Sequence, residues 1–200
     1  MTEFGAVPVE PRVPLLGESE AVRRGEEVGV PDYLARLNVF RVLLHQPPVA
    51  KAVHGLLDHL LFGSTLDRRL RELVIMRLGW RTGSVYEWTQ HWGVATWMEI
   101  DGADIVGCRQ PDAHDGFGEA ERAVLAATDE TLDTGTVSPP TFERCVSACG
   151  GDHAAVIELI ASIGTWQMVA GILRSLEVPL EDGMAPWPPD GVAPAPPAAS

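Results

Sequence analysis

The chain has 200 residues, of which 46% are hydrophobic and 22% are charged, and its formal net charge at pH 7 is -13. This length and apolar content suit one domain with a sizeable core, and they exclude a wholly disordered chain. The acidic balance argues against nucleic acid and anionic membranes as partners, because their phosphate groups repel an acidic surface. A small anionic substrate stays compatible with it, since a pocket can be locally basic.

Lysine and cysteine are both scarce. Lys51 is the single lysine, so Schiff-base chemistry would depend on that residue alone, and the sequence contains no phosphate-binding loop of the GKS or GKT type. There are three cysteines, Cys108, Cys145 and Cys149. This odd, low number, together with a start that lacks the basic and apolar regions of a signal peptide, favours a reduced, cytoplasmic protein. No membrane span is expected, because no stretch approaches 18 uninterrupted apolar residues.

The elements predicted in chain order are all helices. Prolines start several of them and glycines end several, as at Pro47 and Gly63. The helical patterns cover residues 18–27, 33–44, 47–63, 66–83, 85–99, 119–133, 138–149 and 152–176. No alternating strand pattern occurs, so the fold class is all-α, a bundle of helices joined mostly by short loops.

Three stretches interrupt this pattern. Residues 1–30 form a partly extended, partly helical N-terminal segment, because three prolines lie near its start. A connection from Asp101 to Gly118 is longer than most helix connections and could act as a lid or pack on a neighbour. Residues 183–200 contain six prolines and are predicted to be a flexible tail, with Trp187 as the one residue suited to docking. The all-helical domain therefore covers residues 31–182.

One group of polar residues could form a catalytic site. Ser84, Glu87 and His91 are spaced i, i+3 and i+7, which places them on one helix face, with Glu87 in reach of His91. Glu72 lies on the preceding helix, and a turn at Gly83 would fold the two helices antiparallel and bring Glu72 to the same place. A carboxylate beside an imidazole raises its pKa and fixes its tautomer, which makes an acid/base pair. The alternative interpretation is a solvated pair on a helix surface.

Further residues could complete a pocket. Tyr86, Trp88 and Trp92 are aromatic neighbours of this group, although core packing would explain them equally well. Arg77 or Arg81 could hold a substrate carboxylate or form an ordinary salt bridge. Gln167, a polar residue in an apolar helix, could point toward the same pocket.

The segment RELVIMRLGWRTGSVYEWTQH resembles the signature region of the carboxymuconolactone decarboxylase family, whose superfamily also contains the AhpD-type alkylhydroperoxidases. The resemblance covers about residues 39–133 well and the last helix more loosely. In the peroxidase branch, this region carries Cys-x-x-Cys-x-x-x-His and an earlier glutamate. The matching positions here are Ser84, Glu87 and His91, with Glu72 as the earlier glutamate. The redox cysteine pair is therefore missing, which disfavours thiol peroxidase activity.

The resemblance to the decarboxylase branch implies an enzyme that uses no metal and no organic cofactor. It also implies an all-helical subunit in a homo-oligomer, typically a trimer or hexamer, with the site near subunit contacts. On this basis Glu72, Glu87 and His91 are the expected catalytic residues. The expected substrate-binding residues are Ser84, Tyr86, Trp88, Arg81 and Gln167.

The sequence therefore predicts a cofactor-independent lyase or isomerase, of decarboxylase type, that acts on a small oxygenated carboxylic acid or lactone in biosynthetic tailoring or aromatic catabolism. Two alternatives stay open. One is a metal-assisted or other oxidoreductase that uses Glu72, Glu87 and His91 as ligands. The other is a non-catalytic oligomeric or ligand-binding relative that has lost the redox pair. The substrate and the oligomer size do not follow from the sequence.

Overall fold

The computed structural model describes residues 3–196, in which the regular secondary structure consists of helices and no strand occurs. The α-helices are α1 (Glu18–Val28), α2 (Asp32–Ala35), α3 (Asn38–Leu43), α4 (Pro47–Asp58), α5 (Arg68–Thr82), α6 (Val85–Trp97), α7 (Gly102–Gly107), α8 (Glu119–Thr134), α9 (Pro139–Ala148) and α10 (His153–Ser175). A π-helix, η1 (His59–Gly63), continues α4, and a short 3-10 helix, η2 (Pro111–Ala113), follows α7. The prediction of an all-α fold is confirmed.

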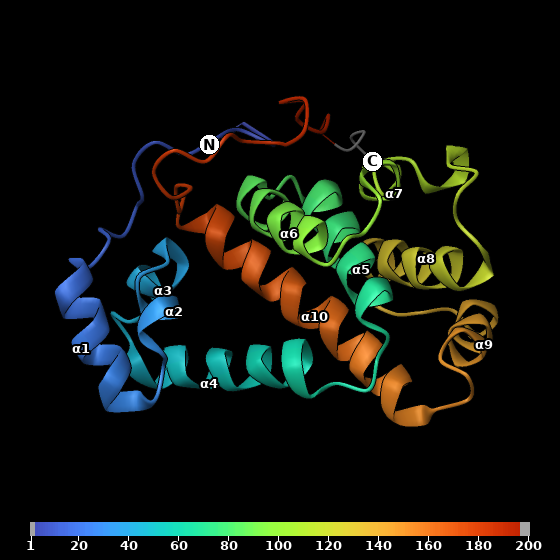
Figure 1. Cartoon of the computed structure of the whole chain (residues 1–200), viewed down its shortest axis with the longest axis horizontal. Coiled ribbons are helices and arrows are strands. Elements are labelled where there is room, and N and C mark those ends of the chain that lie inside the picture. Colours follow the sequence, from blue (N-terminus) through green and yellow to red (C-terminus); the bar gives the residue numbers. More distant parts are fainter. Residues whose placement is uncertain (1–2, 197–200) are drawn as a thin grey trace.

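The long helix α10 crosses the molecule diagonally and separates two groups of helices (Figure 1). α5, α6, α8 and α9 lie on one side, and α1 to α4 gather at the other end. Two clusters of buried side chains match this division. The larger one joins α5, α6, α8 and α10, and the smaller one joins α1, α3 and α4 to the C-terminal end of α10.

Two glycines allow α5 and α6 to pack closely. Gly83 ends α5 in the left-handed conformation, with φ of 66°, and a Cβ there would lie 2.8 Å from the ring of Phe4. Gly79 faces α6 so closely that a Cβ would lie 3.0 Å from the backbone nitrogen of Trp88. A Cβ at Gly79 would therefore push the two helices apart, and one at Gly83 would clash with the N-terminal segment and strain the turn. The tight turn makes α5 and α6 antiparallel neighbours, as the sequence predicts.

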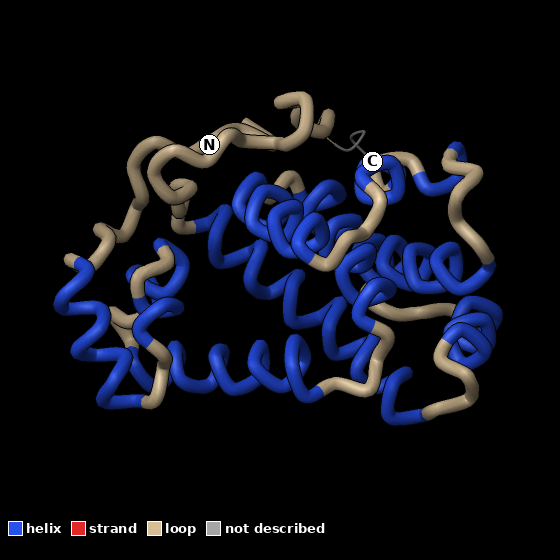
Figure 2. The backbone as a smooth tube through the Cα atoms, viewed as in Figure 1, coloured by secondary structure: helices blue, strands red, loops and turns tan. Residues whose placement is uncertain are grey.

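The C-terminal segment differs from its prediction. Residues 183–196 run along the body beside the N-terminal segment (Figure 2), and Trp187 is only 2% exposed. Its indole nitrogen donates to the carbonyl of Gly5 at 2.9 Å, and the indole nitrogen of Trp88 donates to the carbonyl of Pro188 at 2.7 Å. Burial of a large aromatic ring offsets the entropy lost on ordering the segment. Residues 197–200 of the predicted tail lie outside the described residues.

Two other boundaries also differ. The N-terminal segment belongs to the body, because Ala21 of α1 and the following Val30 are buried in the smaller cluster. The connection between Asp101 and Gly118 contains α7 and η2, and its Ile105 is fully buried in the larger cluster. It therefore packs on its own chain.

Helix α10 has the length and mean hydropathy, 1.6, of a membrane-spanning segment, but half of that window is buried inside the protein. This is the behaviour expected of the central helix of a bundle. Its outward face nevertheless keeps apolar side chains exposed, among them Ile157, Ile160 and Met168.

Candidate active site

Helix α5 places a charged pair inside the core. The side chain of Glu72 is fully buried and that of Arg71 is 3% exposed. The guanidinium donates to Glu72 Oε1 from Nε and Nη2, at 3.2 and 3.1 Å, and from Nη1 to the carbonyls of Leu60 and Leu61. Those carbonyls belong to the π-helix η1. Arg71 therefore holds one carboxylate oxygen of Glu72 and leaves the other free for a further partner.

That partner is His91 of α6, whose ring lies between three elements. Its Nδ1 is 2.8 Å from Glu72 Oε2, and its Nε2 accepts a hydrogen bond from the indole N–H of Trp166 at 3.1 Å. Trp166 belongs to α10. Because an indole only donates, Nε2 presents its lone pair and the proton resides on Nδ1. Glu72 and Trp166 together fix the tautomer and the orientation of the imidazole.

Glu87 approaches the same ring from one turn earlier on α6. Its Oε2 lies 3.7 Å from His91 Nε2, which is within ion-pair range but too long for a hydrogen bond. The sequence predicts that Glu87 orients His91, whereas Glu72 does so. Glu87 instead lies beside the nitrogen that carries the lone pair.

The pKa values of the two carboxylates are shifted in opposite directions. Burial raises the pKa of Glu87 to about 7, against the attraction of His91, and the charge of Glu72 adds to the rise. Burial acts on Glu72 in the same direction, but His91 and Arg71 outweigh it and its pKa is lowered. For His91, burial lowers the pKa, and the Glu72 carboxylate more than compensates, so the pKa is raised. One carboxylate is therefore fixed as an anion while the other changes protonation near neutral pH.

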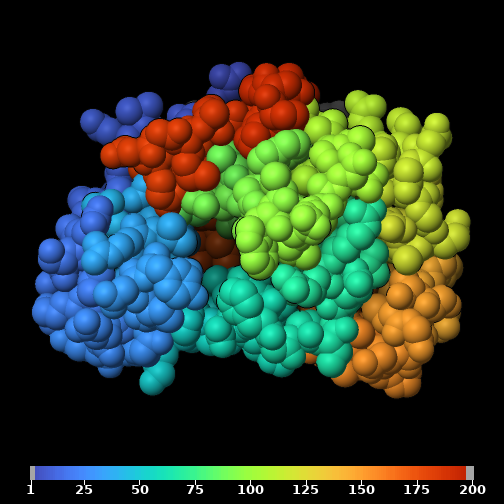
Figure 3. All heavy atoms as spheres, in the orientation of Figure 1, coloured from blue at the N-terminus to red at the C-terminus, as the bar shows by residue number. Residues whose placement is uncertain are grey.

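His91 connects this cluster to solvent, because its side chain is 12% exposed while Glu72 is fully buried. Figure 3 shows the surface hollowed between the light-blue to cyan part of the chain and the green of α6, with atoms in the colour of α10 at the bottom. The helices α6 and α10, which carry His91 and Trp166, thus border this hollow.

The other predicted site residues are not gathered around the imidazole. Ser84 is the first residue before α6, and its buried Oγ has no hydrogen-bond partner. Tyr86 donates its hydroxyl to Glu181 at 2.5 Å, so this hydroxyl is already used within the protein. Trp88 packs against Trp187 and the C-terminal segment.

Two of the predicted residues point elsewhere. Arg81 pairs with Asp129 and Asp133 of α8, at 2.6 and 2.5 Å, on a different face of α5. Gln167 is exposed on α10, while the preceding Trp166 points inward. Successive helical residues are about 100° apart, so only one of the two can face the cluster. Conversely, two members of the cluster were not predicted from the sequence: Arg71, the partner of Glu72, and Trp166, the partner of His91.

The cysteines are isolated from the cluster. Cys108 is buried between α7 and α5, and burial raises the pKa of its thiol well above the usual range. Burial also raises the pKa of Cys145, to about 11, and that of Cys149. Thiols that stay protonated at neutral pH are poor nucleophiles.

The donor set for a metal is also limited. Within residues 3–196, no group of three His, Cys, Asp or Glu side chains is arranged to hold a metal ion. In the Glu72–His91–Glu87 cluster, the two carboxylates lie at opposite nitrogens of one ring. A single ion could therefore not contact all three residues in this arrangement.

Comparison with known proteins supports the resemblance in the sequence. The model of the carboxymuconolactone decarboxylase family matches residues 47–130, which include η1, α5 and α6. Among curated proteins, no relative matches this sequence.

Several solved structures share the fold. A cysteine-to-alanine variant of the debrominase Bmp8, in complex with 2,3,4-tribromopyrrole, is 17% identical and has a TM-score of 0.69; the match covers 88% of this chain and 94% of the debrominase. An AhpD-core, peroxidase-related protein from Ralstonia eutropha JMP134 is 16% identical, with a TM-score of 0.68 and coverage of 86% and 93%. A peroxidase-related protein from Silicibacter sp. TM1040 is 14% identical, with a TM-score of 0.63 and coverage of 93% and 95%. The fold is thus AhpD-like.

Proposed function

We propose, from the membership of this chain in the carboxymuconolactone decarboxylase family over residues 47–130, that it is an acid/base enzyme of the lyase or isomerase type. Its substrates are small oxygenated carboxylic acids or lactones, and it uses no metal and no organic cofactor. The observation that carries the proposal is the buried cluster in which Glu72 and Glu87 flank His91, with pKa values shifted in opposite directions. Pairs of titratable groups with separated pKa values are typical of acid/base sites.

In this mechanism, Glu72 stays ionised and holds His91 through Nδ1, so that Nε2 can accept a proton once its hydrogen bond from Trp166 is released. Glu87, with its pKa of about 7, acts as the proton donor or returns the proton after the first transfer. In an isomerisation, Nε2 removes a proton next to a carbonyl and Glu87 supplies one at the new position. In a decarboxylation, the bond to the carboxylate breaks, its electron pair forms an enolate, and Glu87 protonates the carbon.

Assembly and location are part of the same proposal. The exposed apolar side chains Ile157, Ile160 and Met168 along α10 suit contact with a second copy of the chain, because large exposed apolar patches mark interaction surfaces. A homo-oligomer, a trimer or hexamer, would cover this face. The protein would act in the cytoplasm on a small-molecule substrate, in biosynthetic tailoring or aromatic catabolism.

A proton-exchange assay tests the reaction type before the natural substrate is identified. The protein is incubated in D2O with a panel of 3-oxo acids and lactones, and NMR spectroscopy follows deuterium incorporation and loss of CO2. For any compound that reacts, we expect the variants Glu87→Gln and His91→Gln to lower the rate about 10²- to 10⁴-fold, the usual contribution of general acid/base groups. Glu143→Gln, at an exposed position of α9, serves as the matched control and should keep the full rate.

Two results would contradict the proposal. If both variants kept the full rate, the cluster would not transfer the proton. If the purified protein contained a stoichiometric transition metal that the reaction requires, the cofactor-free mechanism would be excluded, and the metal-assisted alternative would replace it.

A further inference from the structure

A cavity of about 280 Å³ lies at the start of α6, apart from the buried glutamate and histidine side chains. Its walls come from three parts of the chain: the N-terminal segment, the first residues of α6, and the end of α10 with the turn that follows. These segments lie together because the N-terminal segment crosses the end of α10, where the backbone nitrogen of Arg12 donates to the carbonyl of Leu176 at 2.8 Å.

The inner wall contains hydrogen-bond donors that lack acceptors. Ser84 precedes α6 and lines the cavity, yet its side chain makes no capping hydrogen bond to the helix. Its Oγ is buried, Ser84 is only 1% exposed, and the hydroxyl has no partner in the structure. The N–H groups of Tyr86 and Glu87 therefore lack the acceptor that an N-cap serine normally supplies. A buried donor without an acceptor costs about 1–3 kcal/mol, so a ligand that accepts these bonds would bind favourably.

The charges around the cavity add one unpaired cation. Arg12 forms an ion pair with Glu177 at 2.7 Å. Arg174 also lines the cavity; its guanidinium lies over the ring of Phe4 at 5.0 Å, and within residues 3–196 it has no carboxylate partner. Glu3 and Glu177 line the cavity as well, and Glu3, like Arg174, is exposed to solvent. The partial positive charge of the helix start adds to that of Arg174.

We propose that this cavity binds the carboxylate of a small monocarboxylic acid. One carboxylate oxygen accepts from Ser84 Oγ and from the N–H groups at the start of α6, and Arg174 balances the charge from the opposite wall. A carboxylate is then the group by which the substrate of the proposed function is held. Only the statement that the bound acid is a substrate rests on that proposed function. Ser84 and His91 are two turns apart on α6, about 10 Å along the helix axis.

Titration of the full-length protein with propionate, followed by two-dimensional ¹H–¹⁵N NMR, tests the site without turnover. We expect saturable shifts at the amides of Val85 and Tyr86. Ser84→Ala should weaken binding about fivefold and Arg174→Gln about tenfold, in line with the loss of one neutral and one charge-assisted hydrogen bond. Because Ser84 makes no capping bond, its replacement should leave the helix intact, and the spectrum without ligand checks this.

Propionamide, which has the same shape but no charge, is the matched ligand control and should not shift these amides. Arg144→Gln, at a partly exposed arginine of α9, is the matched protein control and should bind propionate normally. Equal shifts with propionamide, shifts that avoid the start of α6, or unchanged binding in both cavity variants would overturn the proposal. Glu87→Gln should retain propionate binding, so that failure of this site and failure of the acid/base function are separable.

Discussion

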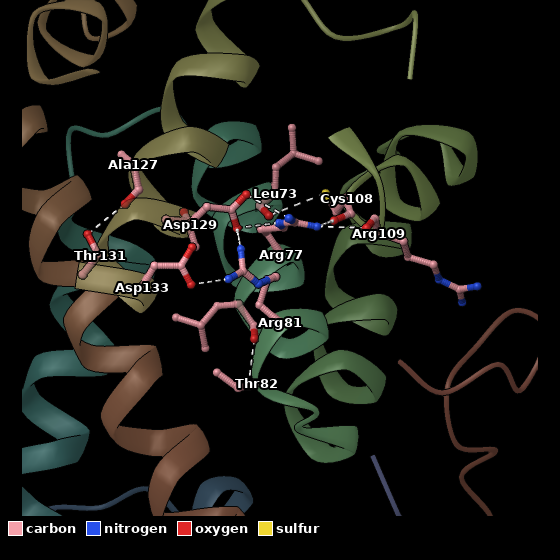
Figure 4. Close-up of polar contacts among 12 residues, drawn as sticks. Leu73, Arg77, Arg81, Thr82, Cys108, Arg109, Ala127, Asp129, Thr131 and Asp133 are labelled. Carbon is pink, nitrogen blue, oxygen red and sulfur yellow. Dashed lines mark hydrogen bonds and ion pairs between the residues drawn. The ribbon is translucent and has the colours of Figure 1, made fainter. Parts of the chain in front are cut away.

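Two of the ionic clusters on helix α5 lie on different faces, and they differ in how fully their charges are matched. Toward α8, Arg77 and Arg81 meet Asp129 and Asp133 in a network with two cations and two anions (Figure 4). Arg77 makes two hydrogen bonds of 2.8 Å to Asp129 and also donates to the carbonyls of Cys108 and Arg109. Every carboxylate in this network has an arginine partner.

Toward α6 and α10, the pairing is incomplete. Arg71 and His91 both contact Glu72, whereas Glu87 has only the ion-pair contact of 3.7 Å with His91. The first cluster braces α5 against α8. The second leaves one buried carboxyl whose protonation changes near pH 7. Glu87, the group suited to proton transfer, therefore lies in the buried cluster with incomplete charge pairing. The cluster with fully paired charges contains no such group.

The largest change is expected from Glu72→Gln. This variant leaves the buried guanidinium of Arg71 without its counter-charge, and it weakens the bond to His91 Nδ1. Removing one partner of a buried ion pair typically costs about 3–5 kcal/mol, which urea denaturation would measure. A loss below about 1 kcal/mol would mean that the carbonyls of Leu60 and Leu61 satisfy Arg71 by themselves.

Glu87→Gln should instead raise the free energy of unfolding at high pH. The folded-state pKa of about 7 lies above the ordinary glutamate value of 4.5, so the folded protein binds this proton more tightly than the unfolded chain. The stability contribution is complete below about pH 4.5 and is lost as the pH rises through 7. At pH 8 the variant should be more stable than the parent by up to about 3 kcal/mol, and the two should be equal near pH 4.5. A difference that does not depend on pH would show that Glu87 titrates normally.

Trp166→Phe should act on His91 through a single hydrogen bond. The indole donates to Nε2 and so favours the neutral ring. Without it, the pKa of His91 should rise by about 0.5–1 unit, the equivalent of one ordinary hydrogen bond. NMR titration of the His91 ring protons would measure the shift. Trp80→Phe, in the cluster around Trp187, is the control, and an equal shift there would rule out the direct bond as the cause.

The smallest effect is expected in the matched network. Arg81 is partly exposed, and Asp129 keeps its two bonds to Arg77 in its absence. Arg81→Gln should therefore cost less than about 1 kcal/mol, as is usual for accessible ion pairs. The unfolding midpoint in urea would measure the cost. A loss comparable to that of Glu72→Gln would remove the distinction between the two clusters.

The local order of the chain could be predicted from the sequence because its signals are local. Gly83 marks the end of α5, and the spacing of Glu87 and His91 places them on one face. The partner of His91 depends on how α5 is rotated against α6, which no local pattern specifies. For this reason Glu72 and Glu87 exchanged their expected roles, and the contribution of Arg71, adjacent to Glu72, was not predicted.

The predictions about where Gln167 and the C-terminal segment lie were wrong for the same reason, because local patterns do not specify packing. Gln167 stood out as a polar residue in an apolar helix, but its side chain faces outward and Trp166 faces inward. The proline content of residues 183–196 correctly indicates the absence of helix. It does not report packing, and Trp187 was the one signal that the segment is held in place.

The docking of both end segments has a practical consequence. Gly5 lies against Ala193 and Pro194, where a Cβ on Gly5 would come within 3.3–3.4 Å of their atoms. A short linker could therefore join Gly5 to the segment at Pro194 in place of the residues beyond them, and the resulting circular permutant could be opened at an exposed loop such as Gly150–Gly151. The N-terminal segment also contributes Glu3, Ala6 and Pro8 to the wall of the cavity at the start of α6. An internal tag, or one removed by a protease, would therefore suit ligand-binding measurements better than one that extends this segment.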